Sequence, residues 1–173
     1  MIARIRRRMR QGLAALIAFA RPVDFGAAAE VLSAQQMALF QRMRRSEQLH
    51  ALRVLQILQA QGHHHPDLLT AALLHDVGKS RYPLTLPERT LVVLMRRLLP
   101  HLAARWSAGR PRGWRRAFVI AQEHPVWSAE DMLAAGASPL AAALARRHQE
   151  RLDGPPQSEE DRLLQLLQAA DEE

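Results

Sequence analysis

Helical periodicity runs through almost the whole chain, and this pattern restricts the fold more than any other feature of the sequence. Apolar residues return at three- and four-residue intervals between capping residues, and no segment shows the alternation of a half-buried strand. Aromatic residues make up only 5% of the chain and β-branched residues are sparse, which favours helices over strands. The 173 residues suffice for one domain with a sizeable core. We therefore expect an all-α fold, a single bundle of roughly seven to nine helices over residues 23–173.

Serines, prolines and glycines predict where these helices begin and end. Ser138 and Ser158 are candidate N-caps, and Pro66 is suited to open a helix because its missing N–H is not needed there. The helices are expected at about 27–43, 47–61, 66–76, 88–105, 114–123, 127–135, 139–150 and 159–170.

The N-terminal segment needs its own interpretation, because five of its first ten residues are arginine and a short apolar run follows. We assign residues 1–22 to a basic amphipathic helix that docks on the domain by its apolar face. Binding of residues 1–20 to an acidic membrane surface is an alternative, and a secretory signal is a third. Arg21-Pro22 makes a poor cleavage site, and the apolar run is far shorter than the about 20 residues that span a bilayer. We expect a cytoplasmic protein, with peripheral membrane attachment as the alternative.

The net charge of +7 comes almost entirely from arginine, since Lys79 is the only lysine. Because the charge is spread along the chain, we interpret most of it as solvated helix surface, with an anionic partner as the alternative. Residues 105–116 combine arginines with Trp106 and Trp114. We expect a solvated turn whose tryptophans lie in the core, although stacking plus charge could also serve a nucleotide or a single strand. No nucleic-acid partner is expected for the protein.

The segment Leu73-Leu-His75-Asp76-Val-Gly78-Lys79 carries the strongest chemical signal. His75 and Asp76 end an apolar helix, where an unpaired buried carboxylate would cost several kcal/mol. A divalent cation would satisfy both side chains, and the carboxylate could bridge two ions. Gly78 permits a sharp exit from the helix and brings Lys79 to the ligand side, where its ammonium could hold a phosphate oxygen.

Other kinds of metal site are excluded or disfavoured. The chain has no cysteine, so thiolate ligands are not available. Three consecutive histidines, residues 63–65, precede Pro66, but neighbours on one loop cannot converge around an ion, and we expect a solvated loop.

The order His50, His75-Asp76 and Asp171 resembles the H…HD…D pattern of the HD superfamily, and Gly78-Lys79 matches its common HDxGK form. The resemblance covers roughly residues 46–171 and implies an HD-domain helical bundle. It also implies that these four ligand side chains, from distant helices, hold one divalent ion. Fe, Mn, Co, Zn and Mg are all compatible with such ligands.

The downstream half is similar to the HD-GYP subfamily, whose members hydrolyse cyclic dinucleotides. His124-Pro125 and the segment from His148 to Gly154 match its HPE and HHExxDG segments. The resemblance implies a second ion held by His124 and His148 and bridged by Asp76. The arrangement is degenerate, because Gln149 replaces the second histidine and the GYP stretch is missing.

These observations predict a metal-dependent phosphohydrolase that acts by attack of metal-bound hydroxide, with Asp76 and Lys79 as catalytic residues. The expected partner is a phosphorylated small molecule, a nucleotide or cyclic (di)nucleotide, and the cofactor is one or two divalent metal ions. One intact site would favour phosphomonoester hydrolysis and a working pair phosphodiester hydrolysis. The alternative is a degenerate HD domain that binds nucleotide or a protein partner as a regulatory module.

Overall fold

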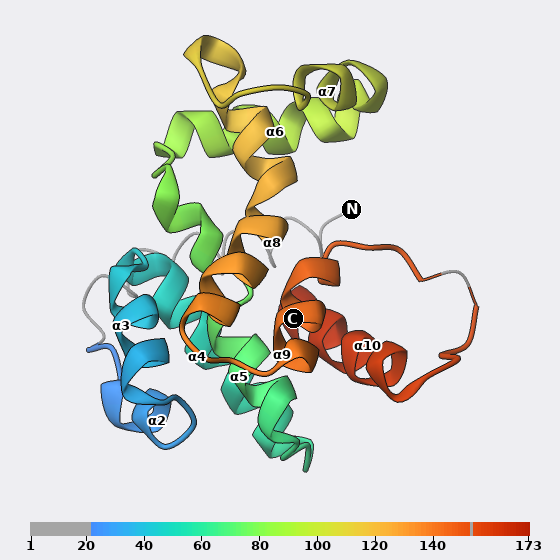
Figure 1. The fold of residues 1–173 in the computed structure, drawn as a ribbon. Coiled ribbons are helices and arrows are strands. Elements are labelled where there is room, and N and C mark those ends of the chain that lie inside the picture. The colour runs from blue at the N-terminus through green and yellow to red at the C-terminus, as the bar shows by residue number, and fades with distance from the viewer. Residues whose placement is uncertain (1–21, 153) are drawn as a thin grey trace, which may run out of the picture.

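The computed structural model describes residues 22–152 and 154–173, and within them it contains nine α-helices, two 3₁₀ segments and no strand. The all-α prediction and the expected number of helices are thus confirmed. The predicted N-terminal helix falls on residues 1–22 and so lies, except for Pro22, outside the described residues. The α-helices are α2 (Phe25–Ala29), α3 (Ala34–Arg42), α4 (Arg45–Ala60), α5 (Pro66–Leu74), α6 (Leu86–Leu98), α7 (Pro100–Trp106), α8 (Arg116–Ala134), α9 (Pro139–Arg147) and α10 (Glu159–Glu172) (Figure 1).

Helix α5 is the centre of the bundle. Every residue from Leu68 to Leu74 is buried, and a helix that is apolar on all sides must be surrounded by others. It packs against α3, α4, α9 and α10, and Pro66 at its first turn supplies the predicted start. Because α5 ends at Leu74, His75 and Asp76 emerge from the middle of the molecule.

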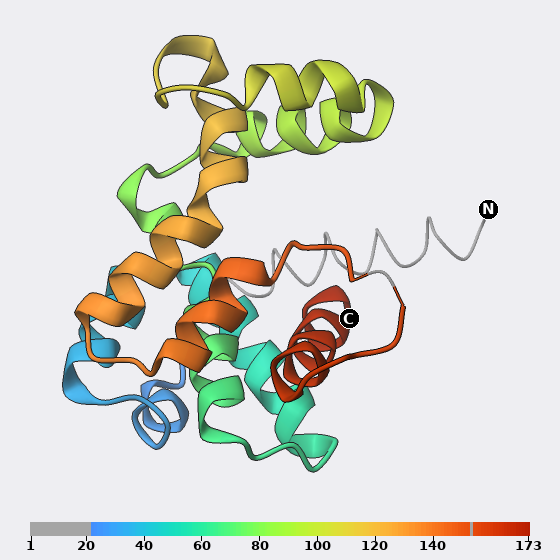
Figure 2. The same ribbon diagram turned by 45° about the vertical axis from the view of Figure 1, so that its right-hand side comes forward.

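A second, smaller core lies at one end of the molecule. Helices α6 and α7 form a hairpin that packs on the first half of α8 through Val92, Ala103 and Phe118. Figures 1 and 2 show this hairpin at the opposite end from α2, with α8 running from one core to the other. The long helix α8 therefore connects the hairpin to the main bundle.

Two predicted helices are each divided in the structure. The expected helix 27–43 is α2 and α3, because the Ser33 side chain caps α3 in a capping box with Gln36 and so starts a new helix. The expected helix 88–105 is α6 and α7, which are separated at Leu99 because Pro100 cannot continue α6.

Two predicted helices, at about 114–123 and 127–135, form a single helix in the structure. This helix is α8, and Pro125 lies inside it. Proline lacks the N–H that would bond the carbonyl of Ala121, four residues earlier. Instead the Arg96 guanidinium of α6 donates to that carbonyl at 2.9 Å. The contact from the hairpin compensates for the missing helical bond, so α8 continues through the proline.

The first tryptophan of the basic-aromatic segment packs as expected, whereas the second does not. Trp106 lies edge-on to Phe118 in the second core. Trp114 is 64% exposed and touches Trp106 from outside, so its predicted place in the core is wrong. No described helix is long and apolar enough to cross a bilayer.

Candidate metal centre

The six predicted ligand side chains converge at one place between the helices of the main bundle. Helix α4 contributes its ligand from mid-helix, α5 and α9 contribute theirs at or just beyond their C-terminal ends, α8 contributes one beside its internal proline, and α10 contributes one from its last turn. The residues are His50, His75, Asp76, His124, His148 and Asp171.

One group of ligand atoms gathers around Asp171. Its Oδ1 lies 2.6 Å from His50 Nε2 and 3.5 Å from His75 Nε2. Ligand atoms of these three residues all lie within 4.8 Å of one another, close enough to surround a single cation. Asp76 Oδ2 approaches the same histidine, at 3.7 Å from His75 Nε2.

The other oxygen of Asp76 faces a different pair of histidines. Asp76 Oδ1 lies 3.3 Å from His124 Nε2 and 3.8 Å from His148 Nε2. The two carboxylate oxygens of Asp76 therefore point at different sets of imidazoles. This orientation is the one that a bridging carboxylate requires.

Backbone carbonyls fix three of the imidazole rings. The Nδ1 atoms of His75, His124 and His148 lie 3.1, 3.1 and 2.7 Å from carbonyls three or four residues earlier in the chain. A neutral ring that donates through Nδ1 carries its lone pair on Nε2, and all three Nε2 atoms face the carboxylates. The local helical backbone therefore sets both the tautomer and the aim of each ring.

Two of these inward atoms lack any hydrogen-bond partner within the described part of the chain. They are His75 Nε2 and Asp76 Oδ1, and both residues are buried. A buried lone pair without a donor costs free energy, and here several lone pairs converge on the same space. A divalent cation would satisfy them all, so the donor set and the geometry fit a metal ion.

The two carboxylates of the centre are negatively charged and so favour a bound cation. Burial opposes ionisation of Asp76, but Lys79 and His75 outweigh it and hold the pKa of Asp76 well below its ordinary value. Asp171 behaves alike, because His50 and His75 lower its pKa against the effect of burial. Burial disfavours the imidazolium of His75, yet the two carboxylates raise its pKa overall. Both carboxylates are therefore ionised and attract a cation.

The two histidines that face Asp76 Oδ1, His124 and His148, are held neutral. Burial lowers the pKa of His124, and burial together with the neighbouring His75 lowers the pKa of His148 to about 3. Neutral imidazole is the form that binds a metal ion. These two side chains therefore offer their lone pairs to a cation without first losing a proton.

Gly78 has a different role from the predicted one. Its φ is not positive, so no left-handed turn requires glycine there. A Cβ on Gly78 would lie 2.3 Å from the carbonyl oxygen of His124 and 2.7 Å from the amide nitrogen of Ser128. The Gly78 N–H donates to Ser128 Oγ at 2.9 Å. Glycine is thus required by close contact between the 3₁₀ segment Val77–Arg81 and α8, beside His124.

Lys79 lies on the ligand side, as expected, and its Nζ is 2.5 Å from Asp76 Oδ2. The ammonium is therefore bound to the same carboxylate that faces the histidines. Gln149 also reaches the centre, since its side-chain amide nitrogen lies 3.3 Å from His124 Nε2. Because His124 bonds the Ile120 carbonyl through Nδ1, its Nε2 accepts this hydrogen bond from Gln149.

Two adjoining pockets open on the centre and share His148, Gln149 and Asp171. The first has a volume of about 330 Å³ and is also lined by Glu47 and Arg89, which form an ion pair between α4 and α6. The sequence interpretation did not include this pair. Glu47 lies three residues before His50, on the same face of α4, and this spacing is the signal that could have identified it.

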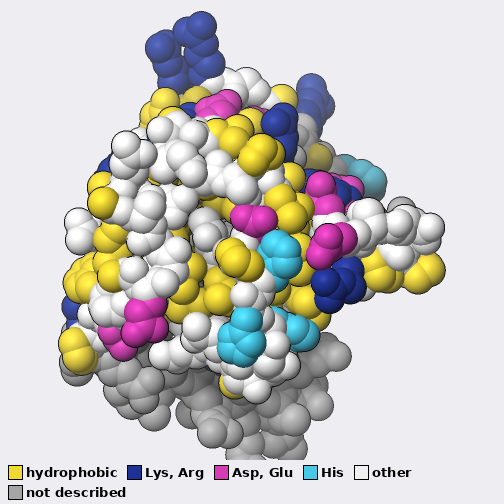
Figure 3. Space-filling view, turned by 60° about the horizontal axis from the view of Figure 1, so that its bottom comes forward, with side chains coloured by type: hydrophobic (Ala, Val, Ile, Leu, Met, Phe, Trp, Pro, Cys, Tyr) yellow, Lys and Arg dark blue, Asp and Glu magenta, His cyan; other side chains and the backbone are white. Residues whose placement is uncertain are grey.

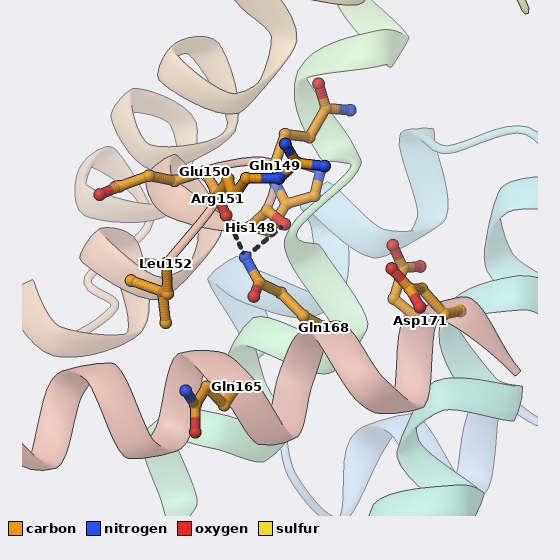
Figure 4. Close-up of a pocket in the computed structure, with 9 residues that line it drawn as sticks. His148, Gln149, Glu150, Arg151, Leu152, Gln165, Gln168 and Asp171 are labelled. Atoms are coloured by element: carbon orange, nitrogen blue, oxygen red, sulfur yellow. Dashed lines mark hydrogen bonds between the residues drawn. The ribbon is translucent and has the colours of Figure 1, made fainter. Parts of the chain in front are cut away.

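The second pocket, of about 400 Å³, lies between the segment after α9 and the outer side of α10. Figure 4 shows Gln168 beneath that segment, where its amide donates to the carbonyls of His148 and Glu150 at 3.1 and 2.7 Å. These bonds tie the backbone at His148 to α10, the helix that also carries Asp171. Gln168 was likewise missed by the sequence interpretation.

The three consecutive histidines before α5 belong to neither group of candidate ligands in the described residues. His64 is exposed, and His65 Nδ1 accepts from the backbone N–H of Asp67 and so caps α5. Figure 3 shows histidine side chains at the surface of one face of the molecule. The expectation of a surface loop agrees with this placement.

The comparisons with known proteins agree with this geometry. The family model described as HD domain matches residues 49–172, a range that includes all six candidate ligands and more than half of the chain. Searches of curated proteins and of solved structures found no match. The match and the His/Asp cluster together lead to one conclusion: the chain belongs to the HD-domain family, a superfamily of metal-dependent hydrolases.

Proposed function

We propose that the protein is a metal-dependent phosphohydrolase that cleaves a phosphomonoester bond of a nucleotide. The observation that carries the proposal is the pair of buried, unpartnered atoms, His75 Nε2 and Asp76 Oδ1, within a cluster of six convergent ligand side chains. The family match supports a hydrolase, and Lys79 and Arg89 beside the cluster support a phosphate-bearing substrate.

The residues at the pocket of about 330 Å³ would have distinct roles in this reaction. His50, His75, Asp76 and Asp171 would hold a divalent ion, which supplies an acidified water and neutralises charge on the phosphate oxygens. Lys79 would donate to an equatorial phosphoryl oxygen while its contact with Asp76 keeps the ammonium in place. The wall formed by Glu47 and Arg89 would position the leaving-group side of the substrate.

A single ion is favoured by the contact of Gln149 with His124. The lone pair of His124 Nε2 accepts a hydrogen bond from the Gln149 amide, and a second ion would have to displace this donor. We take a single occupied site to favour phosphomonoester hydrolysis. Phosphodiester hydrolysis is the second candidate, because Asp76 Oδ1 faces both His124 and His148 in a bridging orientation.

The test combines metal content with turnover by the full chain. We expect the protein, purified and supplied with Mn²⁺ or Fe²⁺, to retain about one ion per chain and to hydrolyse one or more nucleoside monophosphates. Asp76→Asn and His75→Ala should lose both the ion and at least about a thousandfold of turnover. His64→Ala, which removes an exposed histidine, is the matched control and should retain both.

Each other result has a definite meaning. Full turnover by Asp76→Asn contradicts the mechanism, and faster cleavage of cyclic dinucleotides than of monophosphates favours the phosphodiesterase. A protein that binds metal and nucleotide but turns over neither class of substrate supports the alternative regulatory module.

A further inference from the structure

The α6–α7 hairpin exposes a row of large apolar side chains on its outer face. Only Val92 of α6 and Ala103 of α7 are buried. Leu91, Leu94 and Leu98 follow one another at helical spacing on the exposed side of α6, and Leu98 is 62% exposed. We name as the hairpin surface the exposed residues Leu91, Leu94, Leu98, Leu102 and Trp114, with the arginines around them.

The charge of the same region is strongly one-sided. Residues 86–116 contain eight arginines and a single acidic residue, Glu88. Glu88 is already paired with Arg116. Four of the arginines are exposed and form no ion pair with any carboxylate of the described residues. They are Arg97, Arg105, Arg110 and Arg112.

We propose that the hairpin surface docks on an anionic lipid membrane. Its leucines are suited to the boundary between headgroups and acyl chains, its free guanidiniums to lipid phosphates, and an exposed tryptophan such as Trp114 to the interface. The hairpin lies at one end of the molecule (Figures 1 and 2), and none of the exposed leucines of the hairpin surface lines a pocket of the candidate metal centre. Docking there would attach the domain to a membrane without covering these pockets by the leucines themselves.

Charge disfavours the other occupants of this surface. A second copy in a symmetric dimer would place the four exposed, unpaired arginines of one copy near the same four of the other, and a head-to-tail contact would give open chains rather than a closed dimer. Residues 1–21 contain six arginines and no acidic residue, so they too are repelled. A nucleic acid would contact the arginines and could stack on Trp114, but aliphatic leucines are not suited to contact its charged backbone.

The experiment is co-sedimentation of the full chain with vesicles. We expect binding to phosphatidylcholine mixed with phosphatidylglycerol, little binding to phosphatidylcholine alone, and marked weakening at about 0.5 M salt. Two double variants, Leu94→Asp with Leu98→Asp and Arg97→Glu with Arg105→Glu, should each lower partitioning at least about tenfold. Leu133→Asp on α8 and Arg162→Glu on α10 are matched exposed controls and should bind like the wild type.

Tryptophan fluorescence locates the contact independently of sedimentation. The emission of the full chain should shift to shorter wavelength on anionic vesicles, and Trp114→Phe should remove most of this shift without changing the helical circular dichroism.

Four results would overturn the proposal. They are no binding to anionic vesicles, binding that neither double variant weakens, preferential binding of an oligonucleotide that displaces the vesicles, and a stable dimer that the leucine variant dissociates. The second of these would assign membrane binding to another part of the chain.

Discussion

At the scale of single residues, Gly78 shows how a motif position can be identified correctly for the wrong reason. The sequence indicated a glycine that allows a sharp turn, whereas the structure places its Cα against the backbone of α8. That contact joins Val77–Arg81 to the helix that carries His124. The position of Asp76 relative to this histidine therefore depends on the absence of a side chain two residues later.

Gly78→Ala should accordingly destabilise the protein by about 3 kcal/mol or more, because the added Cβ meets backbone atoms that cannot move without shifting α8. Thermal unfolding measures the effect. Ser128→Ala in the same chain should not restore stability, because the carbonyl of His124 remains in the way. Gly26→Ala in α2 is the control, because the only near atom is Asp24 Oδ1 at 3.2 Å, a side-chain atom at the N-cap that can shift, and it should cost much less than Gly78→Ala. A stable Gly78→Ala protein would contradict this account of the contact.

The proposal of a single metal ion depends on Gln149. Gln149→His should raise the metal content from one ion per chain towards two, because it replaces the amide donor on His124 with an imidazole ligand. The measurement is metal content by mass spectrometry after dialysis against buffered Mn²⁺. Gln149→Ala removes the donor without adding a ligand and should stay near one ion. If both the wild type and Gln149→Ala already hold two ions, the single-ion proposal is wrong.

At the scale of helices, α8 shows what local patterns cannot reveal. His124-Pro125 predicted a break, and the two helices expected on either side are in fact one. Continuity depends on Arg96, which is 25 residues away from the carbonyl that it satisfies. The convergence of the candidate ligands was predictable, because their order along the chain resembles a specific family pattern. Contacts between distant helices, such as this one, leave no trace in a local window.

Arg96→Ala should destabilise the protein by about 1–3 kcal/mol, because it leaves the carbonyl of Ala121 without its donor. The cost should shrink when Pro125→Ala is also present, since an alanine N–H can bond that carbonyl within the helix. A double-mutant cycle from denaturant unfolding gives the coupling. Arg97→Ala, at the exposed neighbouring position, should change stability by less than about 0.5 kcal/mol. Additive effects of Arg96→Ala and Pro125→Ala would contradict the proposed compensation.

At the scale of the whole molecule, the candidate metal centre joins five helices. Its two carboxylates are both ionised and repel each other unless a cation lies between them. Carboxylates from the end of α5 and from α10 attract positive charge, and the pKa of His75 is raised in response. A bound divalent ion would replace that proton and stabilise the folded state by its binding free energy. Chelation should therefore lower the melting temperature of the wild type by several degrees and leave that of Asp76→Asn unchanged.

The metal-free protein should also lose stability as the pH falls. The lowered pKa of His148 sets the direction of this change. Its pKa is about 3 in the folded state, well below the ordinary 6.5, because burial disfavours the imidazolium. Between these values the unfolded chain binds a proton that the folded chain does not, so acid favours unfolding. His124 acts in the same direction, while His75, whose pKa is raised, opposes it.

In EDTA, the free energy of unfolding should therefore fall between pH 6.5 and pH 4, with His148 contributing about 3 kcal/mol at most. His148→Gln should flatten this fall, because glutamine has no proton to gain, whereas the exposed His64→Gln should leave the slope as it is. Urea unfolding at a series of pH values measures both slopes. Equal slopes for wild type and His148→Gln would mean that His148 is protonated inside the fold. Its lone pair would then not be available to a metal ion at these pH values, and the bridging orientation of Asp76 would have to serve a hydrogen bond instead.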